Sequence, residues 1–223
     1  MKSGWVALAA LVAEVVAAAL LWGRFPERMP VHWNFSGEAD RFGSRWYTVL
    51  VGPALLTFVW ALLALVSRID PKVVAQRLQP AEEAPPAGPG SVDAVAALLL
   101  GLLGLLHVGL LLSAAGLLAS GPRKYALLVA LFMVLRGNVL GRVRPNFFVG
   151  IRTPWTLSDD QVWRRAHRLS GRLLFGCGLL AAVLAGLLPE GRALGAALAL
   201  LLTSVAVPAI QSYFWWRGSH RGL

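Results

Sequence analysis

The sequence predicts an all-α, polytopic membrane protein with about six transmembrane helices and one cytoplasmic amphipathic helix. Of its 223 residues, 57% are hydrophobic and only 14% are charged, whereas soluble domains are typically about a quarter charged. The apolar residues are gathered in blocks of the length that crosses a bilayer as a helix, roughly 20 residues. The single cysteine, Cys177, excludes a disulfide framework within the chain and a zinc site built from cysteines.

Six apolar blocks are expected to span the membrane. They are residues 4–22, 47–66, a stretch within 93–119, 125–143, 173–188 and 193–216. The first block could be taken for a signal peptide, but it is too long and no polar cleavage region follows it, so we interpret it as an uncleaved helix. The fourth block is the least clear, because it must continue past Arg136 to reach a membrane-spanning length.

A stretch rich in proline and glycine divides the chain. We expect an N-terminal two-helix part at 1–66 with an outer loop at 23–46, a linker at 67–92, and a four-helix part at 93–223 with an inner loop at 137–172. The clustered prolines and glycines of the linker are incompatible with a helix and are typical of an exposed connection.

The net charge of +10 does not indicate a nucleic-acid partner, because the basic residues lie mainly in the loops between apolar blocks. Their distribution instead predicts the orientation in the membrane, since cytoplasmic loops carry an excess of Lys and Arg. With both termini cytoplasmic, about two-thirds of the 21 Lys and Arg fall on the inner side. We therefore expect both termini in the cytoplasm.

The outer loop contains a polar motif around a Ser-Gly turn signal. Its candidate functional residues are Pro30, His32, Asn34, Gly37, Glu38 and Asp40. Prolines restrict the backbone before them, which favours a structured turn with polar capping, or alternatively a recognition surface. A third possibility is a metal site at His32, Glu38 and Asp40, since imidazole and carboxylates suit zinc or manganese. A single histidine makes a weak ligand set, so no metal and no other cofactor is predicted.

The inner loop contains a second, denser motif. Its candidate functional residues are Asn138, Asn146, Gly150, Arg152, Thr153, Trp155 and Thr156. Ser158 and Gln161 have the spacing of a capping box, and they predict an amphipathic interfacial helix leading into the fifth span. Arginines gather on its polar face: Arg164, Arg165, Arg168 and Arg172. They are expected to attract anionic lipid headgroups, with a docking surface for a cytoplasmic protein as the alternative.

Together the two motifs resemble the SdpI family of bacterial membrane immunity and signal-transduction proteins. The matching positions of the inner motif are Asn146, Gly150, Ile151, Arg152, Thr153, Trp155 and Thr156, and those of the outer motif are Pro30, His32, Gly37 and Asp40. The resemblance implies a multi-pass protein of the bacterial plasma membrane that protects against a secreted antimicrobial peptide. It also implies a cytoplasmic repressor as partner, bound when the toxin reaches the membrane.

Three ionisable residues, Glu14, His107 and Arg136, fall inside predicted spans. Such groups normally face the bundle interior with a partner, and we expect a Glu14–Arg136 pair with His107 as its hydrogen-bond partner. The pair could fix helix register, or it could form a proton or ligand path. The path supports an alternative function as a small proton-coupled transporter.

An enzyme is not expected. The remaining candidate would be a metal-dependent membrane hydrolase using the outer-loop residues, but the sequence has no HExxH motif and no nucleophile with an evident base.

Overall fold

The computed structural model describes residues 2–34, 38–71, 74, 92–118 and 121–219. These residues form long helices and one β-hairpin. In chain order the elements are α1 (Lys2–Leu21), a 3₁₀ helix (Trp22–Arg24), β1 (Arg28–Trp33), β2 (Ala39–Ser44), α2 (Arg45–Ile69), α4 (Val92–Ala114), α5 (Arg123–Leu140), α6 (Pro154–Ser158), α7 (Asp160–Leu187) and α8 (Glu190–Ser219).

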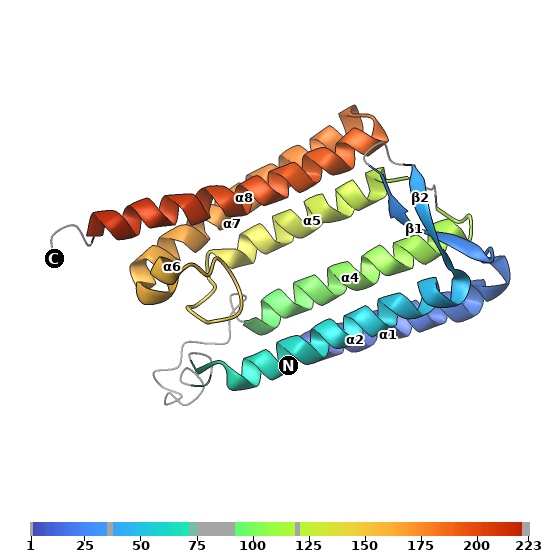
Figure 1. Cartoon of the computed structure of the whole chain (residues 1–223), viewed down its shortest axis with the longest axis horizontal. Coiled ribbons are helices and arrows are strands. Elements are labelled where there is room, and N and C mark those ends of the chain that lie inside the picture. The colour runs from blue at the N-terminus through green and yellow to red at the C-terminus, as the bar shows by residue number, and fades with distance from the viewer. Residues whose placement is uncertain (1, 35–37, 72–73, 75–91, 119–120, 220–223) are drawn as a thin grey trace.

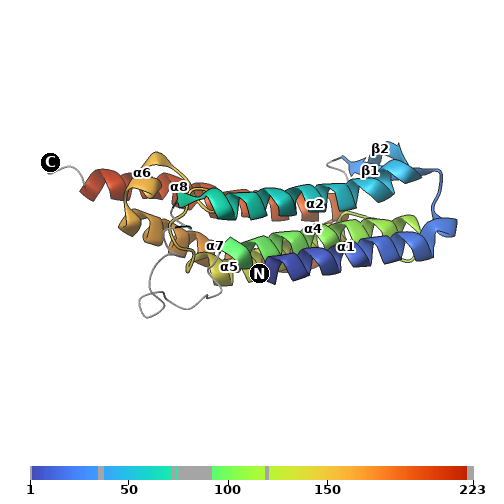
Figure 2. The same cartoon turned by 90° about the horizontal axis from the view of Figure 1, so that it is seen from below.

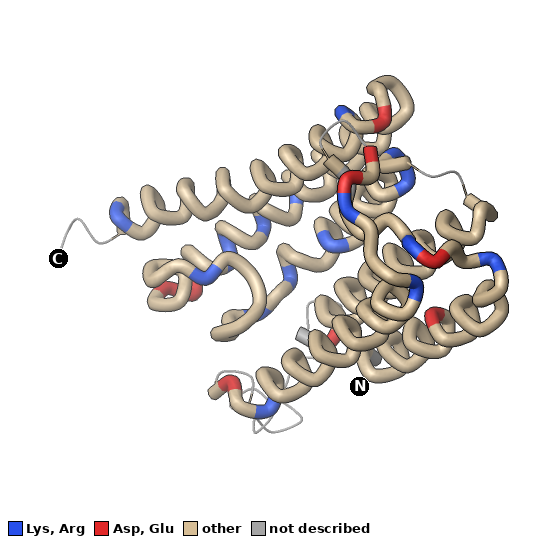
Figure 3. The backbone as a smooth tube through the Cα atoms, turned by 45° about the vertical axis from the view of Figure 1, so that its right-hand side comes forward, with Lys and Arg blue, Asp and Glu red and all other residues tan. Residues whose placement is uncertain are grey.

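Five of the described helices are long and apolar enough to cross a membrane: α1, α2, α4, α7 and α8. This confirms the polytopic helical membrane fold. The fourth predicted span corresponds to α5, which is helical but has only 18 residues and contains Arg123, Lys124 and Arg136. The count of six spans therefore stays a prediction. In Figure 3 the charged residues lie mainly toward the helix ends and in the hairpin, and most of the tube between them is uncharged.

The long helices lie side by side, with the hairpin at one end and α6 at the other (Figures 1 and 2). We call these the outer end and the inner end, after the predicted orientation. Helices α1, α2 and α4 pack together, as do α5, α7 and α8, and the contact between α4 and α5 joins the two groups. The sequence-based division places α4 in the four-helix part, whereas in the structure α4 packs mainly with α1.

Small residues bring α5 and α7 close together. A Cβ atom at Gly137 would lie 2.6 Å from the backbone nitrogen of Phe175, and one at Gly178 would lie 2.9 Å from the carbonyl oxygen of Ala130. Both distances are below normal contact, so these helices meet backbone to backbone, as is common in membrane bundles. The inner loop therefore connects two closely packed helices.

The amphipathic helix and the fifth span form one continuous helix, α7, rather than two elements. The predicted capping box at Ser158 and Gln161 is wrong. Asp159 caps α7, its carboxylate accepting the backbone N–H groups of Gln161 and Val162, while the Ser158 hydroxyl bonds the carbonyl of Trp155 within α6. A carboxylate at a helix N-terminus also interacts favourably with the helix dipole, which favours Asp159 over the serine.

The predicted linker, 67–92, lies largely outside the described residues. Its first residues continue α2 to Ile69, and its last residue begins α4.

Candidate functional site

The outer motif forms an antiparallel β-hairpin, an element that the all-α prediction did not include. Pro30 pairs with Phe42 and His32 pairs with Arg41, with register irregularities on both sides of His32. His32 Nδ1 lies 2.6 Å from Asp40 Oδ1, and this hydrogen bond holds the pKa of Asp40 below its usual value. Asn34 and Glu38 bind each other across the strand ends, since Asn34 Nδ2 donates to Glu38 Oε2 and Glu38 N–H donates to Asn34 Oδ1.

The three weak metal candidates are therefore divided. His32 and Asp40 are in contact, but Glu38 is bound to Asn34. Among the described residues, no three His, Cys, Asp or Glu side chains gather as a metal-ligand set. Gly37 lies outside the described residues.

The hairpin is fastened to the helices on both sides. Met29 is fully buried in an apolar cluster with residues of α1, α2 and α4. Ser44, the last residue of β2, caps α2 by accepting the N–H of Tyr47. The indole ring of Trp46, near the start of α2, packs 4.3 Å from that of Trp22. Strand β2 therefore continues directly into α2 without a flexible connection.

Inside the N-terminal helix group, Glu14 meets His107 rather than Arg136. Glu14 Oε1 lies 3.3 Å from His107 Nδ1, and both side chains are buried. The other ring nitrogen, Nε2, lies 2.9 Å from the Thr48 carbonyl oxygen of α2. Gly52 makes room for the ring, because a Cβ there would overlap the imidazole of His107.

The predicted Glu14–Arg136 pair is wrong. Among the described residues, the only ion-pair contact of Glu14 is with His107. Arg136 belongs to α5 in the other helix group, near His167 of α7. The pairing was expected because both residues fall inside predicted spans, and a position inside a span does not determine which helices are neighbours.

The inner motif is organised around Asn146, which is 1% exposed. Its Nδ2 donates to the carbonyls of Arg144 and Val149, and its Oδ1 accepts the N–H groups of Phe148 and Val149. One side chain thus replaces the hydrogen bonds that the turn cannot make with regular secondary structure. Asn138, by contrast, is exposed on α5 and bonds only the carbonyl of Val134, one turn earlier.

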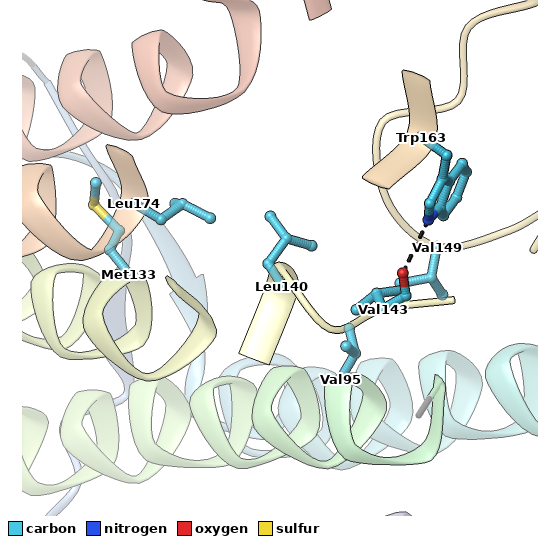
Figure 4. Close-up of a cluster of buried hydrophobic side chains, with 7 residues drawn as sticks. All are labelled: Val95, Met133, Leu140, Val143, Val149, Trp163 and Leu174. Atoms are coloured by element: carbon cyan, nitrogen blue, oxygen red, sulfur yellow. Dashed lines mark hydrogen bonds between the residues drawn. The ribbon is translucent and has the colours of Figure 1, made fainter. Parts of the chain in front are cut away.

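A second buried residue, His167 of α7, fixes the other end of this turn. Its Nε2 accepts the N–H of Ile151, and its Nδ1 donates to the carbonyl of Trp163. Gly150 is needed here for two reasons: its φ is +114°, and a Cβ would overlap the imidazole of His167. Trp163 stacks on the imidazole and donates its indole N–H to the Val143 carbonyl, within the apolar cluster shown in Figure 4.

The remaining motif residues join the turn to α6 and α8. Arg152 donates from Nη1 to the Phe147 carbonyl at 2.8 Å. Thr153 caps α6 in a capping box with Thr156, whose hydroxyl also donates to the carbonyl of Ile151. Trp155 donates its indole N–H to Ser212 of α8. Side-chain hydrogen bonds therefore hold the segment from Asn146 to Thr156 in a defined turn.

The helix that follows presents the predicted arginine face. Arg164, Arg165 and Arg168 are exposed and, with Gln161, line a surface pocket. The opposite face carries buried residues such as Val162 and Ala166.

The sequence analysis did not identify three residues that hold the inner site together: Asp70, Trp163 and His167. The most consequential is Asp70, the fully buried C-terminal cap of α2, whose Oδ2 accepts the N–H of Phe147 in the inner motif at 2.8 Å. An acidic residue directly after a membrane span was the only signal available, and it fell in the stretch assigned to the linker.

Known proteins and protein families resemble parts of this chain or nearly all of it. Residues 142–212 match the SdpI/YfhL protein family, and residues 9–57 match a domain of unknown function, DUF1648. The chain is 23% identical to "Immunity protein SdpI" of Bacillus subtilis over 97% of both chains. It is also 34% identical to an uncharacterised protein of Archaeoglobus fulgidus, over 27% of this chain and 37% of that protein. No solved structure matches. The first family match covers the inner motif from Asn146 onward, α6, α7 and most of α8, so this part of the chain is similar to the SdpI/YfhL protein family.

Proposed function

We propose that the chain is a membrane immunity and signal-transducing protein of the bacterial plasma membrane, and that α2 connects its outer and inner sites. The immunity role is taken from the name of the Bacillus subtilis relative. The observation that carries the proposal is the pair of attachments of α2: Ser44 of the hairpin caps its first turn, and Asp70 at its last turn bonds Phe147 of the inner motif.

Helix α2 is continuous over 25 residues, although Pro53 inside it removes one backbone hydrogen bond. In this proposal a displacement of the hairpin is carried along α2 to the inner motif. In this scheme a secreted antimicrobial peptide, or the membrane damage that it causes, acts on the hairpin at the outer end. The inner motif and the arginine face of α7 then change their presentation to a cytoplasmic repressor. Anionic lipid headgroups bind the same arginines when no protein partner is present. No reaction step is needed, so the protein acts without enzymatic chemistry.

The test uses cells that lack their own immunity protein and the secreted killing peptide to which the family's name-giving member confers immunity. Expression of this chain should raise survival above that of cells with an empty vector. Survival equal to the empty vector would remove the immunity role for that peptide.

Signalling is tested separately, by labelling a cysteine at the inner motif. Phe148 is 37% exposed, and Phe148→Cys in a Cys177→Ala background reports its accessibility to a thiol reagent. We expect the labelling rate to change when peptide is added, and Asp70→Ala to abolish that change. Asp93→Ala is the control, because Asp93 also lies near the inner end and bonds Ser3 of α1. Survival with unchanged labelling would mean immunity without transmission through α2.

A further inference from the structure

The buried contact between Glu14 and His107 has chemistry that a packing role does not require. Glu14 is 1% exposed and His107 is 8% exposed, with 3.3 Å between Oε1 and Nδ1. Among the described residues, neither carboxylate oxygen of Glu14 has a hydrogen-bond partner, nor does His107 Nδ1. Buried polar atoms are normally hydrogen-bonded, so three such atoms in one place call for an explanation.

The other ring nitrogen determines how many protons the pair holds. His107 Nε2 faces the Thr48 carbonyl oxygen at 2.9 Å. A carbonyl oxygen only accepts, so Nε2 must carry a hydrogen. In a neutral imidazole Nδ1 then bears a lone pair, which faces the carboxyl oxygen of Glu14. Two lone pairs at this distance repel, so one further proton must lie on one of the two atoms.

Two arrangements satisfy this condition. Either Glu14 is a neutral carboxylic acid facing a neutral imidazole, or it is a carboxylate facing an imidazolium. Both are neutral as a pair and contain the same single proton. Its transfer forms the N–H bond as the O–H bond breaks and requires no other reactant.

Among the described residues, His107 is the only group in ion-pair contact with Glu14, so no third charge contacts the pair directly if this proton is lost or a second one is gained. The remaining charged residues of the three helices lie toward the helix ends: Lys2 on α1, Arg45 and Arg68 on α2, and Asp93 on α4. On the neighbouring α5, Lys124 bonds Ser113 of α4, and Arg136 lies near His167. A net charge at this depth costs several kcal/mol unless it is compensated, which favours a single proton on the pair.

We propose that Glu14 and His107 form a buried proton-binding site, with one exchangeable proton held between Oε1 and Nδ1. The site joins α1, α4 and α2, because Glu14, His107 and the Thr48 carbonyl come from those three helices in turn. Gly52 packs directly against this site, because any side chain at that position would displace the His107 imidazole. Loss of the proton leaves a carboxylate facing a lone pair, so the occupancy of the site is coupled to the packing of α1 against α4.

Nuclear magnetic resonance of protein labelled with ¹⁵N-histidine tests the site in the full chain in detergent or nanodiscs. His167 is an internal reference, because its bonds fix the opposite tautomer, with hydrogen on Nδ1 and an accepting Nε2. We expect a protonated Nε2 at His107, and an Nδ1 signal that changes in the same pH step as a carboxyl band in the infrared spectrum. Interacting groups lose their shared proton as a pair rather than separately.

Glu14→Gln should remove that infrared band and the linked change of the His107 Nδ1 signal, because the partner that shares the proton is gone. Glu190→Gln, an exposed carboxyl at the start of α8, should change neither signal. Either a His107 ring with hydrogen on Nδ1 only, or separate pH steps for the two residues, would overturn the proposal. The tautomer of His107 and the pH steps of the two residues are both measured on the wild-type protein. The proposal can therefore be refuted even if the Glu14→Gln variant does not fold.

Discussion

Replacing Asn146 by aspartate removes a hydrogen-bond donor from the centre of the inner motif without changing the size of the side chain. Two bonds are lost, from Nδ2 to the carbonyls of Arg144 and Val149, while the two bonds accepted by Oδ1 can remain. At about 0.5–1.5 kcal/mol per bond, this loss amounts to about 1–3 kcal/mol. The new carboxylate also faces two carbonyl oxygens at a site that is 1% exposed, which adds about 1–3 kcal/mol. We therefore expect a total destabilisation of about 2–6 kcal/mol.

Asn138→Asp is the matched control, because Asn138 is exposed and makes one bond within its own helix. Its cost should stay within about 0.5 kcal/mol. Chemical unfolding of both variants in the same detergent measures the difference, which should shrink at acidic pH as the introduced carboxyl regains a proton to donate. Equal stability of the two variants would show that the inner motif does not depend on Asn146 as its organising residue.

Other substitutions probe the two motifs residue by residue. Arg152→Lys should impair signalling at normal protein abundance, because the guanidinium that bonds the Phe147 carbonyl is replaced by a point charge. Arg164→Lys should be tolerated. The survival and labelling assays compare the two variants. Gly150→Ala should lower the unfolding midpoint, because alanine is strained at this positive φ and its Cβ would clash with the His167 imidazole. The backbone strain alone should cost about 1–3 kcal/mol. A variant as stable as the wild type would contradict this account of the turn. The pKa of Asp40 is lowered by its hydrogen bond with His32. The contribution of this bond to hairpin stability is therefore present above the unfolded pKa of Asp40 and is lost as pH falls through the folded pKa. Proteolysis of the hairpin should accelerate at acidic pH, and it should accelerate less in the Asp40→Asn variant.

Hydropathy was sufficient to predict the helices, because each span must satisfy its own backbone in the membrane. It could not predict which helices are neighbours, and the error over Glu14 and Arg136 came from that gap. The amphipathic helix was predicted to lead into the fifth span, but not to form one unbroken helix with it, because the two segments have different compositions.

The two motifs were predictable as structured segments but not as particular structures. Pro30 suggested a constrained loop, yet the register of the hairpin depends on pairs such as His32 with Arg41. In the inner motif, Asn146, Gly150 and Thr153 were identified as candidates, and each has a defined place in the turn. Their partner His167 was not identified, because a histidine one turn away from several arginines gives no signal of burial in the sequence.

The two helix groups use their buried polar residues in opposite ways. In the C-terminal group Asn146 and His167 have complete sets of hydrogen bonds, which favour a single arrangement and resist change. In the N-terminal group, among the described residues, Glu14 has one ion-pair contact, to His107, so fewer polar contacts hold its helices in a single arrangement. A device that transmits a signal needs one part that moves against one part that stays fixed. We therefore expect backbone amides beside Glu14 to exchange hydrogen faster than those beside His167, and an opposite order would assign the moving part to the C-terminal group.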